Sequence, residues 1–250
     1  MNVFLSELVK LKRSLSWAIV VLLPIILVAS GSIMTLIDGR GLEDGWHTLW
    51  MRSIVFYGLF PLAVGIAILA SFIWRAEHRG SNWNALMAGP TSSLKIVLAK
   101  AAVVAVLAAV MQVIAVMTAV VLGKLAFGLP GWLPVEYLGF SLIIVVASIP
   151  VAVLQSWLSM AMRSFAAPVA VAFLGAGFSA FLLVLDLDAA IFVSPYAVVS
   201  RATQLGTATF ADTGDITLAV LAMITAASLV LSAVLAAANT LVLERTDART

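Results

Sequence analysis

The chain has 250 residues, of which 63% are hydrophobic and only 10% are charged, and its formal net charge at pH 7 is +2. A soluble domain carries about 25% charged residues, so this composition excludes an ordinary soluble protein and predicts a membrane protein. The chain contains no cysteine, which excludes a disulfide framework and any thiolate metal site.

The charged residues are clustered, and they leave six long windows without a charge. These windows cover residues 14–37, 53–74, 101–123, 137–162, 164–185 and 216–243. A helix that rises about 1.5 Å per residue needs roughly 20 residues to cross the hydrocarbon core, and each window is long enough. Strands of a membrane barrel alternate over about 10 residues, whereas these windows are continuously apolar. We therefore expect an all-α polytopic membrane protein.

The windows define six transmembrane helices in a single transmembrane domain that covers residues 1–250. The spans are expected at about residues 16–37, 54–74, 98–122, 138–162, 164–185 and 216–243.

A short segment of mixed polarity, residues 1–13 (MNVFLSELVKLKR), precedes the first span. Its apolar side chains recur at helical spacing, and its charged side chains fall on other faces. The apolar set is Val3, Phe4, Leu8 and Leu11, and the charged set is Glu7, Lys10 and Lys12. This pattern predicts an amphipathic helix at the membrane interface, with a frayed terminus as the alternative.

The distribution of lysine and arginine predicts the orientation, because six spans place both termini on one side of the membrane. The N-terminal side holds ten basic residues, namely Lys10, Lys12, Arg13, Arg75, Arg79, Lys95, Lys100, Arg163, Arg245 and Arg249. The opposite side holds four, namely Arg40, Arg52, Lys124 and Arg201. Since basic residues are enriched in cytoplasmic loops, both termini are expected in the cytoplasm. The sequence pI of about 9.2 then requires no nucleic-acid partner.

Two outer segments carry recognisable patterns. Residues 38–52 contain Trp46 and Trp50, which is typical of an aromatic belt near the lipid headgroups. Residues 186–215 form the largest outer loop, which we expect to be either a small external cap or a plain loop. Within it, residues 189–200 are apolar but too short to span and contain a proline, which favours an interfacial or re-entrant piece.

The longest inner connection, residues 75–97, has an ordered pattern. A helix from about residue 76 to 88 would be closed by Gly89, and Pro90 would prevent its continuation. Its apolar face would be formed by Ala76, Gly80, Trp83 and Met87. The pattern predicts a short transverse helix that either rests on lipid or is presented to a cytoplasmic protein.

Two stretches of the sequence resemble a known family. SELVKLKRS, which leads into the first span, resembles the permeases of type 2 ATP-binding-cassette (ABC) transporters. AEHRGSNWNALMAGPTSSLKIVLAK in the inner loop resembles them too, with an acidic residue, a glycine, an apolar pair, a proline and a lysine at the next span. The resemblance covers the six-span topology and is greatest to the branch of lantibiotic and bacteriocin immunity permeases.

The resemblance implies partners and a coupling site. In that family the loop between spans two and three is the coupling helix, which sits in a cleft of the ATP-binding subunit. Carried over to this chain, the coupling residues would be Glu77, His78, Arg79, Gly80, Asn82 and Trp83. The resemblance also implies two cytoplasmic ATP-binding subunits per complex, which would hold ATP and Mg²⁺, and a second permease chain, identical or homologous.

The residues themselves argue against catalysis in this chain. A P-loop requires G-x-x-x-x-G-K-[ST], and the only Gly-Lys pair, at residues 123 and 124, is followed by Leu125. The histidines, His47 and His78, are expected on opposite sides of a bilayer of roughly 30 Å, so they cannot share a metal or haem. We therefore expect no enzymatic activity, no metal site and no cofactor in this chain.

The charge-free windows also argue against a proton-coupled carrier, which keeps ionisable groups within its spans. Neutral polar residues in the spans are then the candidates for the substrate path, namely Gln112, Thr118, Gln155, Ser159 and Asn239. Such groups also make interhelical hydrogen bonds, and that reading stays open for each of them.

The expected function is that of a permease subunit of an ABC transporter in the bacterial cytoplasmic (plasma) membrane. It would export an amphipathic or hydrophobic compound, such as a peptide antibiotic (lantibiotic) or a drug, and would serve immunity or antibiotic resistance. The alternative is an integral membrane structural or assembly subunit, or a passive channel without ATP coupling.

Overall fold

The structure is a computed structural model that describes residues 4, 7, 11, 14–37, 42–79, 83, 91–210, 212, 214 and 216–247. The helices are α2 (Ser16–Ile37), α3 (Gly45–Leu59), α4 (Pro61–Arg75), α6 (Ser93–Leu125), α7 (Val135–Ala161), α8 (Ala166–Val184), α9 (Asp188–Ile191), α10 (Pro195–Thr203) and α11 (Leu218–Asp247). Within the described ranges the secondary structure is helical and contains no strand. The predicted all-α class is therefore confirmed.

The long helices are numerous, long and apolar enough to form a polytopic membrane protein. Five of them are long and apolar enough to cross a membrane, and the number rises to six if α3 and α4 count as one bent span. The helix bounds report where the backbone is helical, so the membrane boundaries of the expected spans stay predictions. The interfacial helix expected over residues 1–13 falls mostly outside the described residues, which include only Phe4, Glu7 and Leu11 of that segment.

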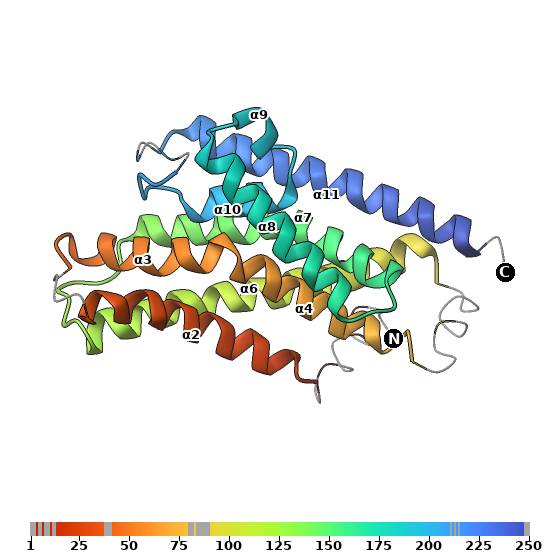
Figure 1. Cartoon of the computed structure of the whole chain (residues 1–250), viewed down its shortest axis with the longest axis horizontal. Coiled ribbons are helices and arrows are strands. Elements are labelled where there is room, and N and C mark those ends of the chain that lie inside the picture. Colours follow the sequence, from red (N-terminus) through yellow and green to blue (C-terminus); the bar gives the residue numbers. More distant parts are fainter. Residues whose placement is uncertain are drawn as a thin grey trace.

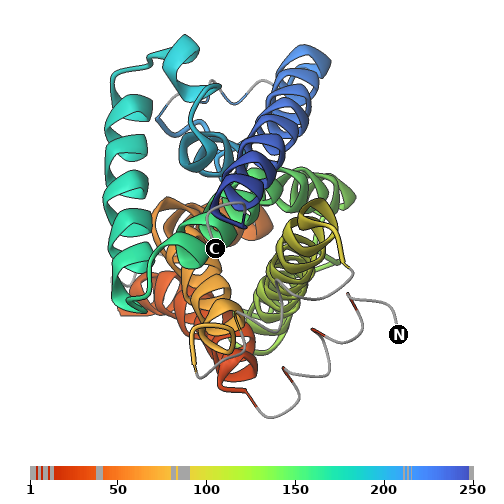
Figure 2. The same ribbon diagram turned by 90° about the vertical axis from the view of Figure 1, so that its right-hand side faces the viewer.

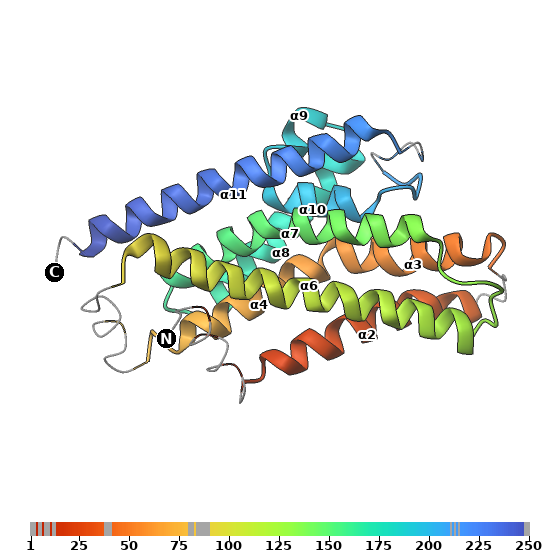
Figure 3. The same ribbon diagram turned by 180° about the vertical axis from the view of Figure 1, so that it is seen from behind.

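The long helices run along the longest axis of the molecule (Figure 1). The first turn of α2 and the last turn of α11 lie towards the same end, together with the end of α4 and the start of α6. Figure 3 shows that α6 and α11 extend along most of this axis. This arrangement places the predicted inner segments at one end of the bundle, which we call the N-terminal end.

Helix α7 occupies the centre of the packing, since it contacts α4, α6, α10 and α11. Viewed along the bundle in Figure 2, α8 and α11 lie at the outside. Their outer faces carry exposed large apolar side chains, among them Leu174, Phe178, Val230 and Val234. An exposed apolar surface of this extent is expected of a face in contact with lipid acyl chains.

Helices α3 and α4 meet at Phe60 with a bend of 46°. The cause is local, because Pro61 lacks a backbone N–H and its ring clashes with the carbonyl four residues earlier. Pro61 is instead well suited to the first position of α4, where no intrahelical donor is needed. The Val64 amide donates to the Phe60 carbonyl at 3.0 Å and closes the first turn of α4.

The aromatic-belt interpretation of Trp46 and Trp50 is wrong. Helix α3 begins at Gly45, well before the expected start of the second span, and both indoles are buried in the core, with 8% and 1% exposure. Trp46 donates from Nε1 to the Pro130 carbonyl at 2.8 Å. Its ring packs against Gly123 of α6, where any Cβ would collide with it. The glycine provides the space that lets the indole pack inward instead of facing headgroups.

The segment between α8 and α11 is a packed cap. Pro195 occupies the first turn of α10, and the Ser194 hydroxyl accepts from the Ala197 amide at 3.4 Å as an N-cap. Residues 196–203 are all buried, and α10 lies against α3, α7, α8 and α11. Of the two alternatives for the outer loop, the structure therefore favours the cap.

A substitution at Gly58 tests how closely α10 docks on α3. Any Cβ at Gly58 would meet the side chain of Thr203, so Gly58→Val is expected to push the helices apart. Overpacking of this kind costs about 1–3 kcal/mol, which predicts a fall in Tm of about 2–12 °C for a chain of this length. The measurement is thermal unfolding of the purified protein in detergent. Gly139→Val is the matched control, because a Cβ at Gly139 meets nothing within 4 Å; equal Tm values for the two variants would contradict the prediction.

Candidate functional site

The candidate site lies at the N-terminal end of the bundle, where the chain leaves α4 and enters α6. The structure describes residues 75–79, 83 and 91–97 of the expected coupling loop. Of the transverse helix expected from about residue 76 to 88, the structure describes residues 76–79, which form a turn and not a helix, and Trp83. The rest of that segment, with the candidate residues Gly80 and Asn82, lies outside the described residues.

A buried ammonium organises this end. Lys100 lies in the second turn of α6 and is only 1% exposed. Its Nζ donates to Glu7 Oε2 at 2.8 Å and to Glu77 Oε1 at 2.9 Å. Nζ also lies 4.7 Å from the centroid of the Trp74 ring. The charge is thereby compensated by two charge-assisted hydrogen bonds and by the π face of an indole.

The two carboxylates come from different parts of the chain. Glu7 belongs to the N-terminal segment and Glu77 follows α4, and both are 4% exposed. Burial removes the water that would otherwise screen these charges, so the attraction of each carboxylate for Lys100 is stronger than in an exposed pair. Lys100 consequently ties the N-terminal segment and the end of α4 to α6, and we call these three residues the Lys100 cluster.

A second set of contacts ties the same region to α7. His78 donates from Nε2 to the Ser159 carbonyl at 2.8 Å, which requires the proton on that ring nitrogen because a carbonyl only accepts. The imidazole stacks on Trp83, with ring centroids 5.9 Å apart and an interplanar angle of 6°. Trp74 donates from Nε1 to Ser156 Oγ at 2.9 Å. The end of α4 is therefore anchored on both α6 and α7.

The described coupling candidates differ in exposure. Glu77 is buried in the Lys100 cluster, His78 and Trp83 are half-buried against each other, and Arg79 is exposed. Of these four, Arg79 offers the side chain most open to a partner, while Glu77 holds the segment in place. The assignment of these residues to ATPase coupling stays a prediction.

The substrate-path candidates are held by partners within the protein. Gln112 donates to Ser141 Oγ at 3.2 Å, and Gln155 donates to the Tyr196 hydroxyl. Asn239 donates to the Val153 carbonyl at 3.3 Å. These bonds link α6 to α7, α7 to α10 and α11 to α7, so each amide makes the interhelical bond that was the alternative to ligand binding.

The hydroxyl candidates behave differently from each other. Thr118 donates to the Ile114 carbonyl of its own helix at 2.8 Å. Ser159 Oγ lies 3.2 Å from Ser71 Oγ of α4, and Ser159 borders a cavity near the end of α7. A substrate-binding role for all five stays a prediction.

Comparison with known proteins places the chain in a family. A family model described as ABC-2 family transporter protein matches residues 3–179. The chain belongs to the ABC-2 transporter family. Searches of curated proteins and of solved structures gave no match.

Membership assigns this ABC-2 permease its general role. It is a multi-pass membrane protein, and members of the family act with ATP-binding subunits that carry the ATPase activity. The matched range contains the whole Lys100 cluster and ends within α8. The region of closest family likeness therefore includes the end of the ABC-2 permease at which the candidate coupling residues lie.

Sequence reasoning missed Lys100 and Glu7 as structural partners. Lys100 was counted as one of the basic residues of the inner segments, although helical spacing places it on the same face of α6 as Ile96, Val103 and Leu107, and all of these are buried. Apolar residues occur on every face of α6, so its sequence has no amphipathic pattern that would indicate which face is buried. The role of Lys100 is revealed by its pairing with Glu7, 93 residues away, and with Glu77.

Proposed function

We propose that the chain is the permease subunit of an ABC exporter in the bacterial cytoplasmic membrane, with both termini in the cytoplasm. It would work with a second permease chain, identical or homologous, and with two ATP-binding subunits. ATP and Mg²⁺ would be bound by those subunits. In this arrangement the N-terminal end of the bundle faces the ATP-binding subunits.

The observation that carries the proposal is the anchoring of the segment after α4. A push on residues 75–79 would be transmitted to α6 through the Glu77–Lys100 ion pair and to α7 through the bond from His78 to the Ser159 carbonyl. Packed helices and charge-assisted bonds deform little, so such a push moves whole helices rather than one loop. Arg79 follows the anchored residues directly, and Trp83 stacks on His78; these two are the contacts proposed for the partner subunit.

The cargo proposed is an amphipathic or hydrophobic compound, with a peptide antibiotic of the lantibiotic class or a drug as the first candidates. Support comes from the long helices, in which the buried polar groups of the described residues are neutral amides and hydroxyls such as Gln112, Gln155 and Ser159, with the exception of Lys100 near the start of α6. A lining without fixed charge favours a lipophilic cargo over an ion or a sugar. The resemblance to lantibiotic and bacteriocin immunity permeases supports a role in immunity to a bacteriocin.

Coupling is tested with Arg79→Ala and Trp83→Ala in a complex with the ATP-binding subunit. The variants are expected to co-purify with that subunit but to lose most of the cargo-stimulated ATP hydrolysis and transport, measured in proteoliposomes. Exposed Arg79 contributes little to stability, so its loss acts on the contact and not on the fold. Arg245→Ala is the control, because Arg245 is exposed in the last turn of α11 at the same end.

Two outcomes would overturn parts of the proposal. If both variants couple hydrolysis to transport like the parent, the coupling residues are wrongly assigned. If no ATP-binding subunit can be co-purified with the parent, the chain is instead a structural or assembly subunit, or a passive channel.

A further inference from the structure

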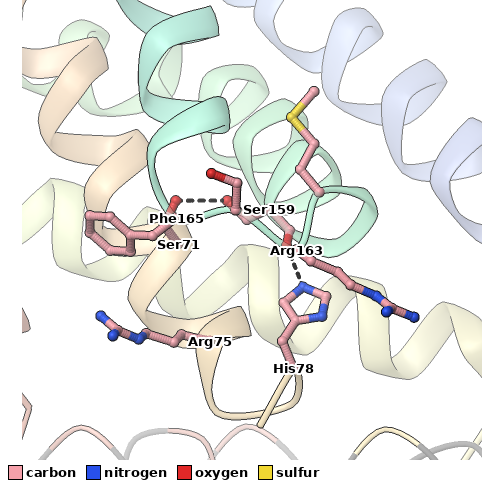
Figure 4. Close-up of a pocket in the computed structure, with 8 residues that line it drawn as sticks. Ser71, Arg75, His78, Ser159, Arg163 and Phe165 are labelled. Carbon is pink, nitrogen blue, oxygen red and sulfur yellow. Dashed lines mark hydrogen bonds between the residues drawn. The ribbon is translucent and has the colours of Figure 1, made fainter.

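A small cavity opens at the N-terminal end of the bundle, between the end of α4 and the turn from α7 to α8 (Figure 4). Its volume is about 190 Å³. The polar lining consists of Ser71, Arg75, His78, Ser159, Arg163 and Ser164, and no carboxylate of the described residues lines the cavity. The cavity thus combines hydrogen-bond donors with positive charge.

The two arginines stand on either side of the cavity, where Figure 4 shows their guanidinium groups extending to opposite sides of His78. Both side chains are exposed, and among the described residues neither forms an ion pair with a carboxylate. Arg75 Cζ lies 5.7 Å from the centroid of the Phe165 ring. An arginine that rests on an aromatic face keeps its N–H groups available for an anion, and the guanidinium fork matches the oxygens of a phosphate.

The floor of the cavity is fixed while the arginines are able to turn. The His78 ring is held by its bond to the Ser159 carbonyl, and the Ser71 and Ser159 hydroxyls are bonded to each other at 3.2 Å. The Ser164 hydroxyl accepts from the Ala167 amide at 3.4 Å and still has its own proton to donate. The base thus offers one hydroxyl proton of the Ser71–Ser159 pair and the proton of Ser164. Together with two long cationic side chains at the rim, these donors suit a phosphate that enters from the side.

The surroundings favour a phosphate carried by a lipid. The cavity lies beside the first turn of α8, and the outer face of this candidate span is apolar, with Phe173, Leu174 and Phe178 between 58% and 71% exposed. Phe165 at the rim packs on Phe72 of α4, with ring centroids 5.1 Å apart. Acyl chains lying along α8 would therefore hold a headgroup at the level of the cavity. Basic pockets between membrane helices are known to bind anionic headgroups in this way.

We propose that this cavity binds the phosphate of an anionic phospholipid, with Arg75 and Arg163 as its cationic contacts and the acyl chains against α8. The site is distinct from the Lys100 cluster and from Arg79 and Trp83, the contacts proposed for the ATP-binding subunit. His78 in its floor is also one of the coupling candidates. The proposal does not depend on the direction of transport or on the cargo.

Lipid retention tests the proposal. The full chain is placed in nanodiscs of equal parts palmitoyloleoylphosphatidylglycerol and palmitoyloleoylphosphatidylcholine, and the lipids that stay bound are counted by native mass spectrometry. The parent is expected to retain phosphatidylglycerol in about tenfold preference. Arg75→Gln/Arg163→Gln is expected to bring this ratio close to one. An unchanged ratio in the double variant would overturn the proposal.

The control variant also removes two positive charges from the N-terminal end of the bundle. Lys95→Gln/Arg245→Gln eliminates two exposed cations that do not line the cavity, and it is expected to keep the preference. If the control loses the preference to the same extent as the cavity variant, the attraction comes from overall surface charge and the proposed site does not exist. If the double glutamine variant aggregates, Arg163→Gln alone is expected to lower the ratio about threefold, and no change in that ratio would overturn the proposal equally.

A second arm distinguishes a lipid from a free anion. Sodium phosphate is titrated into the lipid-free protein in detergent, against sodium chloride at equal ionic strength, and Tm is recorded. No stabilisation by phosphate is expected, because the acyl chains supply part of the affinity. Stabilisation of the parent but not of Arg75→Gln/Arg163→Gln would identify free phosphate as the ligand and would overturn the assignment to a lipid.

Discussion

The Lys100→Met variant is expected to unfold at a much lower temperature than the parent protein. Methionine keeps the length of the side chain but removes the ammonium that lies 2.8 Å from Glu7 and 2.9 Å from Glu77. Removing one partner of a buried ion pair costs about 3–5 kcal/mol, since the opposite charge stays buried. Two carboxylates are affected here, and for a chain of this length the expected fall in Tm is about 10 °C or more.

Thermal unfolding of the purified chain in detergent measures this effect, and two further variants define its origin. Lys95→Met removes an exposed lysine from the preceding turn of α6 and is expected to shift Tm by less than about 2 °C. Combining Lys100→Met with Glu7→Gln and Glu77→Gln also removes the two carboxylate charges that face residue 100, so more than half of the lost stability is expected to return. Similar Tm values for Lys100→Met and Lys95→Met would contradict the ion-pair interpretation.

Asp212→Ala is expected to loosen the cap formed by α10 and the residues that follow it. The Asp212 carboxylate is 6% exposed and accepts from Arg201 Nη1 at 2.9 Å. It also accepts from the backbone amides of Thr207, Ala208 and Gly214 at 3.0, 3.1 and 3.2 Å. The variant leaves the buried Arg201 guanidinium without its carboxylate and three amides without their acceptor, at an expected cost of about 3–5 kcal/mol.

Limited proteolysis and thermal unfolding together measure the loosening. Cleavage after Arg201 by trypsin is expected to become at least several-fold faster in Asp212→Ala, and Tm is expected to fall by about 6 °C or more. Glu136→Ala, which removes an exposed carboxylate from the first turn of α7, serves as the control. An unchanged cleavage rate at Arg201 would show that Asp212 does not hold the cap.

The sequence predicts the number and type of the long helices well because the signal is a local one. Each apolar window corresponds to one helix or one bent pair of helices. A helix needs little more than sufficient length and an apolar composition to span a membrane. The start of α3 was missed since Arg52 interrupts the charge-free window, yet this half-buried arginine lies in the middle of α3. A charge therefore sets the limit of an apolar window without ending the helix.

The side-chain pairings cannot be predicted from the sequence alone, because the partners are not neighbours along the chain. Lys100 with Glu7, and Gln155 with Tyr196, join residues that are far apart along the chain, and nothing in the local pattern selects these partners from the other polar residues. The same holds for Gly58 and Gly123. Only the structure shows why each position lacks a Cβ, because Thr203 packs against Gly58 and Trp46 packs against Gly123. The family resemblance points to residues 75–97 as the coupling loop, but it does not predict which of these residues are buried.

The bend between α3 and α4 also creates the attachment point of α10. Gly58 lies in the last turn of α3, where carbonyls lack helical donors ahead of them, and its carbonyl accepts from the Ser200 hydroxyl at 3.3 Å. Straightening the span would return this carbonyl to the helical ladder and withdraw it from Ser200. The angle between α3 and α4 and the position of the cap therefore depend on the same backbone carbonyl.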